Sequence, residues 1–85
     1  MPLKRGQIVR SLAGRDRGTL LVVLAVKDDG ALLADGKARP LARPKFKKAK
    51  HLARTDRFLN EPSLTTDRAV IRGLRDAFQT VGGEN

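Results

Sequence analysis

Cysteine is absent from this 85-residue chain. Without it no disulfide can form and no thiolate can hold a metal ion, and the absence is in keeping with a reducing cytoplasm. Tryptophan and tyrosine are absent too, and phenylalanine occurs only three times. The core must therefore be aliphatic, and a reader of single strands that depends on many aromatic platforms is disfavoured.

Long apolar runs are also missing. The longest, residues 20–26, is far too short to span a bilayer. The first six residues carry no apolar stretch of the kind found in a signal peptide. We therefore expect a cytoplasmic protein that does not contact membranes.

Acidic residues are scarce relative to basic ones, with nine Asp or Glu against 18 Lys or Arg. The excess is concentrated in residues 37–57, where nine Lys or Arg and one Asp give a net charge of +8. Residues 1–36 have a net charge of +2 and residues 58–85 a net charge of −1. Such a concentration of cations favours a polyanionic partner, nucleic acid first of all.

Short apolar segments separated by turn residues predict a small, mainly β domain, a barrel or a sandwich. The Asp-Asp-Gly sequence at 28–30 is typical of a hairpin turn, and Asp35-Gly36-Lys37 is a second turn of the same chemistry. The expected strands are residues 7–11, 19–27, 31–34 and 45–50.

The basic segment contains structural cues as well as charge. Pro40 and Pro44 restrict their stretch to an edge or an irregular position. Phe46 is expected to anchor the strand at 45–50 as its one large apolar side chain. Residues 51–53 either close the sheet or form a short turn, and the polar stretch that follows is expected to be a linker.

Apolar residues at helical spacing predict a C-terminal helix over about residues 66–81. Thr65 or Thr66 can cap its first turn, and Gly82-Gly83 is expected to end it. Its arginines could enter a groove, but its apolar face needs cover, so we expect it to pack on the sheet. That face comprises Val70, Ile71, Leu74, Phe78 and Val81. We divide the chain into a barrel at 1–57 and a linker with this helix at 58–85.

The loop Gly14-Arg15-Asp16-Arg17-Gly18 lies between the first two expected strands. Two glycines allow a tight backbone, and two arginine forks can grip phosphate. Asp16 either holds the shape of the loop or orients an arginine. By its chemistry alone the segment could equally be an ordinary hairpin loop.

Catalysis and metal binding have little support. His51 is the single histidine, and no carboxylate or second histidine stands at a metal-ligand spacing from it. We therefore expect no catalytic residue, no metal and no cofactor. The residues that we expect to contact RNA are Arg10, Gly14, Arg15, Arg17, Gly18, Arg43, Lys45, Lys47, Lys48, Lys50 and His51.

The order of these features resembles the KOW family, most of all its small bacterial RNA-binding members, which are similar to KOW-bearing large-subunit ribosomal proteins. The matching segments are residues 6–18, 34–36, 50–52, 64–67 and 71–72. The family's motif glycine corresponds to Gly18 and its RNA-facing loop to residues 14–18. The family often has lysine where this chain has Arg15 and Arg17.

The resemblance implies an SH3-like barrel that binds ribosomal or other structured RNA in a translation context, is monomeric when free, and can meet ribosomal or transcription proteins. Because KOW domains of NusG-type factors can contact proteins, the alternative is a protein-interaction module. Double-stranded DNA binding is a weaker alternative, because the expected helix is needed to cover the core and no other helix is available to enter a DNA groove.

Overall fold

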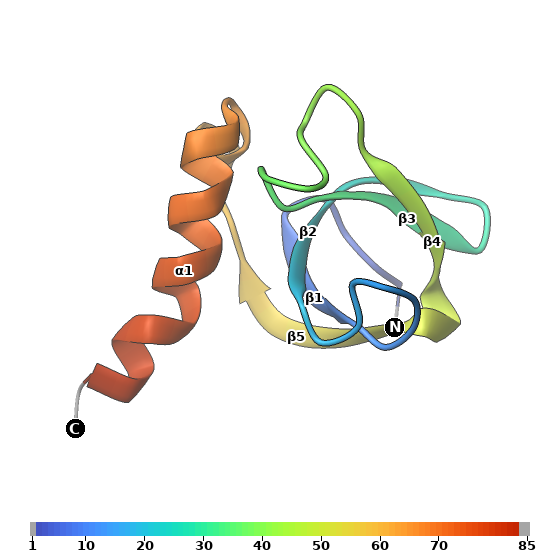
Figure 1. Ribbon diagram of the computed structural model, residues 1–85, viewed down its shortest axis with the longest axis horizontal. Helices are drawn as coiled ribbons and strands as arrows, with labels where there is room; N and C mark the ends of the chain where they lie inside the picture. The colour runs from blue at the N-terminus through green and yellow to red at the C-terminus, as the bar shows by residue number, and fades with distance from the viewer. Residues whose placement is uncertain (1, 84–85) are drawn as a thin grey trace.

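The computed structural model describes residues 2–83, with side-chain environments for residues 2–77. Five strands are followed by one helix, and two short 3-10 turns, η1 and η2, come before and after the last strand (Figure 1). The strands are β1 (Gln7–Ser11), β2 (Leu20–Lys27), β3 (Gly30–Ala34), β4 (Lys45–Lys48) and β5 (Leu52–Phe58). The remaining elements are η1 (Ala49–His51), η2 (Glu61–Leu64) and α1 (Asp67–Gly83).

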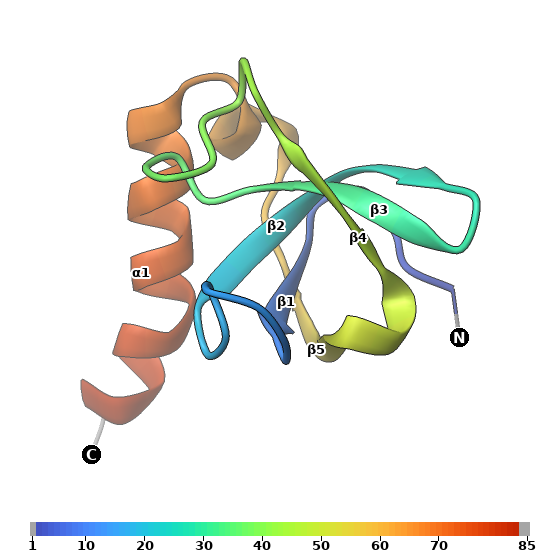
Figure 2. The same cartoon turned by 45° about the vertical axis from the view of Figure 1, so that its right-hand side comes forward.

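All strand pairs are antiparallel, in the order β4-β3-β2-β1-β5. The sheet curves strongly, so that the ends of β4 and β5 come together at η1 (Figures 1 and 2). No pairing joins β4 to β5 within the described residues. The mainly β class is thus confirmed, whereas the sheet is open and does not close into the expected barrel.

The central strand β2 is covered on both faces, which explains its nearly continuous apolar sequence. Leu21 and Val23 belong to one core inside the curved sheet, together with Val9 and Leu33. Val22 belongs to a second core on the outer face. That core also contains Ile8, Leu64, Val70 and Leu74. Helix α1 therefore covers the convex face of the sheet, as Figure 2 shows.

The helix begins close to its expected start, where Thr66 Oγ1 accepts a hydrogen bond from Ala69 N at 3.1 Å. It runs to Gly83, the last described residue, and thus includes Gly82-Gly83 and is about two residues longer than expected. The side chains of Phe78 and Val81, expected on its apolar face, lie outside the described ones. No helix in the described part of the chain is long and apolar enough to cross a membrane.

Strand β5 is the element that the sequence revealed least. Residues 51–53 were expected either to close the sheet or to form a short turn; Leu52 and Ala53 begin β5, which pairs with β1 and continues through the polar stretch to Phe58. Its apolar content is low because it is an edge strand whose side chains are at most half-buried after Leu52. Alternation of exposed Arg54 and Asp56 with half-buried Thr55 and Arg57 was the available signal.

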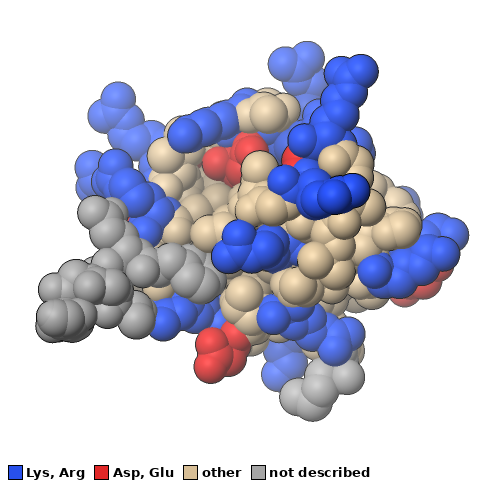
Figure 3. All heavy atoms as spheres, turned by 60° about the horizontal axis from the view of Figure 1, so that its bottom comes forward, with Lys and Arg blue, Asp and Glu red and all other residues tan. Residues whose placement is uncertain are grey.

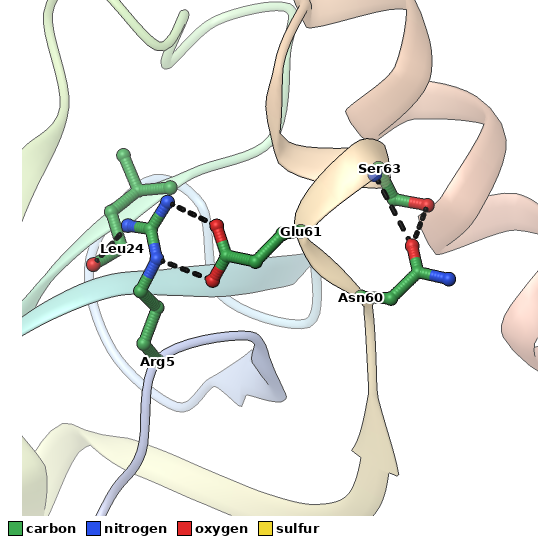
Figure 4. A network of polar contacts seen from close by, with 5 residues as sticks. All are labelled: Arg5, Leu24, Asn60, Glu61 and Ser63. Carbon is green, nitrogen blue, oxygen red and sulfur yellow. Dashed lines mark hydrogen bonds and ion pairs between the residues drawn. The ribbon is translucent and has the colours of Figure 1, made fainter.

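Hydrogen bonds and an ion pair link the start of the chain to η2, the short turn that precedes α1 (Figure 4). Arg5 Nε and Nη2 donate to Glu61 Oε2 and Oε1 at 2.9 and 3.0 Å, and Arg5 Nη1 donates to the carbonyl of Leu24. The hydrogen bonds from Arg5 hold the pKa of Glu61 below its ordinary value. Asn60 Oδ1 caps η2 by accepting a hydrogen bond from Ser63 N at 3.2 Å, and it also accepts one from Ser63 Oγ at 2.9 Å.

The turn between β2 and β3 is confirmed, but its glycine serves a different purpose from the one expected. Asp28 takes the positive φ of +51°. Gly30 is required because β4 passes over it: a Cβ there would collide with the carbonyl oxygen of Lys47 and lie 2.8 Å from Lys48 Cα. The β3–β4 pairing therefore depends on a missing side chain.

Gly30→Ala is expected to lower the free energy of unfolding by about 1–3 kcal/mol, because backbone atoms must move to admit the methyl group. Gly73→Ala is the matched control. Its methyl group would meet only the side chain of Leu59, 2.9 Å away, and alanine favours a helix interior by about 0.5–1 kcal/mol. Urea unfolding of both variants checks this, and equal stability of the two would contradict it.

Candidate nucleic-acid interface

The loop between β1 and β2 is shaped by its own hydrogen bonds. Gly14 and Gly18 have φ of +86° and +88°, which L side chains adopt only at a cost. Asp16 is the hub: its Oδ1 accepts from Ser11 Oγ at 2.8 Å, and its carbonyl accepts from Thr19 N and Oγ1 at 3.0 and 2.7 Å. Of the two roles expected for Asp16, holding the loop shape is the one observed.

Lys47 fastens this loop to β4. Its side chain is only 9% exposed, and its Nζ lies 3.2 Å from Asp16 Oδ1, whose side chain is 17% exposed. Nζ also donates to the carbonyl of Ala13 at 2.8 Å. Burial alone would raise the pKa of Asp16, but the hydrogen bonds from Ser11 and Lys47 and the charge of Lys47 outweigh it and lower that pKa.

The alternation along β4 reverses the expected roles of its side chains. Lys47 faces inward opposite buried Ala31, whereas Phe46 faces outward opposite Leu32 and is 38% exposed. Phe46 is therefore not the anchor of the strand, and the expectation that it would be is wrong. Lys47 takes that place, so its charge serves the protein interior instead of a phosphate.

The structure brings the loop and η1 side by side. The amide of Leu12 donates to the carbonyl of His51 at 2.9 Å, and the contacts of Lys47 join the loop to β4, the strand that directly precedes η1. The loop carries exposed Arg15 and Arg17, and the neighbouring β4 and η1 carry exposed Lys48 and Lys50. We call these four cations the basic rim.

The rim carries little compensating negative charge. Lys48 Nζ lies 3.9 Å from Asp29 Oδ2, a distance and exposure at which the pair is weak. Arg10, on β1, donates a hydrogen bond from Nη1 to the carbonyl of Gly18 at 2.9 Å, which links β1 to the end of the loop. Figure 3 shows that Lys and Arg atoms far outnumber Asp and Glu atoms on the face that includes this end of the molecule.

Other expected contacts lie elsewhere. Lys45 is at the opposite end of β4, opposite Leu33, about 10 Å along the strand from Lys48. Arg43 follows a turn in which the amide of Leu41 donates to Asp67 Oδ1 at 2.7 Å, so it lies toward the start of α1. His51 is half-buried and contributes its carbonyl to the loop contact described above.

Helix α1 carries a separate basic surface. Arg68, Arg72 and Arg75 are exposed on its outer side, and Arg75 lies 3.6 Å from Asp76. The helix lies across the molecule from η1 in Figure 1. These helix arginines therefore do not belong to the basic rim, although they add to the total charge.

The arrangement offers charge and hydrogen-bond donors, the chemistry that recognises phosphates. Among the described residues, no group of three or more His, Asp or Glu side chains could hold a metal ion. No protein-family model matches the sequence, and no curated protein is significantly similar to it.

Proposed function

We propose that this chain is a non-enzymatic RNA-binding module of the KOW type, in which the basic rim binds phosphates of structured RNA, ribosomal RNA being the foremost candidate. In this proposal the open, strongly curved sheet corresponds to the SH3-like barrel of that family. Contacts of this kind position a protein on RNA without reading its sequence.

The buried Lys47–Asp16 pair is the observation that carries the proposal. It joins two segments that are 31 residues apart, so that the loop carrying Arg15 and Arg17 is held against β4, the strand that ends with Lys48. Like charges placed together repel one another in the free protein, and a polyanion relieves that repulsion. A loop held in place by its own hydrogen bonds also loses little conformational freedom on binding.

The resemblance to KOW proteins supports the same conclusion independently. The two glycines that match the motif are those that adopt positive φ in the loop. Gly18 has no heavy atom within 4 Å of where a Cβ would lie, so the requirement for glycine there is conformational.

A salt titration of RNA binding tests the proposal. We expect a structured RNA to bind at low salt, with the logarithm of affinity falling by about 0.7 to 0.9 for each phosphate contact per tenfold rise in salt. Filter binding measures this, with a DNA duplex of equal length as competitor. Failure to bind structured RNA at low salt would overturn the proposal, and preferential binding to the duplex would favour DNA instead.

A pull-down with and without nuclease separates RNA binding from the protein-interaction alternative. Partners bridged by RNA are lost on digestion. A partner that stays bound after digestion, in a preparation whose protein fails to bind RNA directly, would support the alternative.

A further inference from the structure

The outward face of β4 presents an aromatic ring to solvent. Phe46 is 38% exposed, and the buried residues among the described side chains include no aromatic one. Its cross-strand neighbour Leu32 is half-buried, and the next neighbour, Ala25 on β2, is exposed. The three strands therefore form a small apolar platform with the ring at its edge.

Cations border this platform in the adjoining row of the sheet. Lys48 lies opposite Gly30, which lies opposite Lys27. Residues two apart on a strand share a face, so Lys48 and Lys27 project on the same side as Phe46. Gly30 itself has no side chain, and the backbone of β4 occupies the space where its Cβ would lie. Lys48 also belongs to the basic rim, so the platform and the rim share this residue.

We infer that Phe46 stacks on an unpaired base of the RNA whose backbone the basic rim holds. This inference rests on the proposed function and specifies its substrate: a structured RNA with an unpaired nucleotide next to a paired stem. Unpaired bases can leave the helix and stack on aromatic side chains, whereas paired bases cannot. The flanking lysines supply the charge that a nucleotide requires and that an apolar protein partner does not.

The other exposed phenylalanine does not share this setting. Phe58 is 52% exposed at the end of β5 and lines a hollow with Leu59 and Ala77 beside α1. Its ladder partner is the buried Gln7 of β1. Phe58 is therefore a matched control of the same chemistry, outside the platform.

The test compares a fully paired RNA stem with the same stem carrying one unpaired purine. We expect Phe46→Ala to weaken binding of the second RNA by about five- to 150-fold, the range seen when a stacking side chain is lost. Binding of the paired stem should change little, and Phe58→Ala should affect neither RNA. Thermal melts of each variant show that the fold is retained.

A tryptophan substitution gives a direct readout, because the chain has no Trp or Tyr of its own. The RNA with the unpaired purine should quench the fluorescence of Phe46→Trp more than the paired stem does, and should leave Phe58→Trp unchanged. If Phe46→Ala binds each of the two RNAs as tightly as the wild type does, the inference about Phe46 is overturned while the proposed function stands. Failure of the wild type to bind either RNA would overturn the proposed function with it.

Discussion

Lys47→Ala is expected to lower the free energy of unfolding by about 3 kcal/mol, although a lysine-to-alanine change is usually mild. The substitution leaves the Asp16 carboxylate without its ion-pair partner at a site where the side chain is 17% exposed. Removing one member of a buried pair is costly because the other charge stays behind, about 3–5 kcal/mol when burial is complete. Partial exposure of Asp16 favours the lower end of that range.

Thermal unfolding should show this as a fall in Tm of roughly 12 to 24 °C for a domain of this size. Lys45→Ala is the control, since Lys45 lies on the same strand and is exposed. Asp16→Asn, Lys47→Ala and the variant that carries both changes complete a double-mutant cycle, and the double variant should be less destabilised than the sum of the single ones. A fall in Tm for Lys47→Ala no greater than for Lys45→Ala would contradict the assigned role.

Because of the Lys47–Asp16 pair, we expect the free energy of unfolding to depend on pH in the acidic range. The pKa of Asp16 is lowered in the folded protein from an ordinary value of 3.8. Its contribution to stability is therefore complete only well above pH 3.8, begins to fall as the pH approaches that value, and is lost as the pH falls through the folded pKa. Asp16→Asn lacks this contribution, so its deficit relative to the wild type should shrink in urea unfolding between pH 5 and pH 3.

The strands β1 to β3 and the helix were predictable because their side chains are apolar at the periods that burial imposes. Residues 20–24 combine buried side chains on both faces, and the sequence shows this as an unbroken aliphatic run. Strand β5 was missed because an edge strand with water on much of its surface needs few apolar residues. Its stability comes from pairing with β1, a contact that no local pattern in the sequence specifies.

In the candidate site, too, some features could be predicted from the sequence and others could not. The positive charge of residues 37–57 and the glycines of the loop could be read directly. Which of Phe46 and Lys47 faces inward could not, because that depends on the register between β3 and β4, and a shift of one residue exchanges the two faces. Apolar character favoured Phe46 for the interior. The carboxylate of Asp16, brought there by the loop, makes Lys47 the better occupant.

Neutralising the basic rim is expected to cause the largest change in RNA binding. Each phosphate contact with a slope of 0.7–0.9 contributes about five- to eightfold to affinity at 0.1 M salt relative to 1 M. Replacing all four rim residues by alanine should therefore weaken binding on the order of a thousandfold. The slope of the logarithm of affinity against the logarithm of salt concentration should become less steep by about 3. The double variant Arg15→Ala/Arg17→Ala should lower the logarithm of the affinity by about half as much as the four-residue variant does.

A second variant with the same net charge makes this test specific to position. Lys37, Arg68, Arg72 and Arg75 are exposed and lie at α1 and beside it, since Lys37 and Arg75 line one hollow. Replacing these four by alanine removes the same charge and should weaken binding far less, by long-range attraction alone. Equal losses for the two variants in filter binding would mean that total charge, and not the rim, governs the affinity. A large loss for the rim variant alone, with an unchanged Tm, would show that the four cations of the basic rim act together on the RNA.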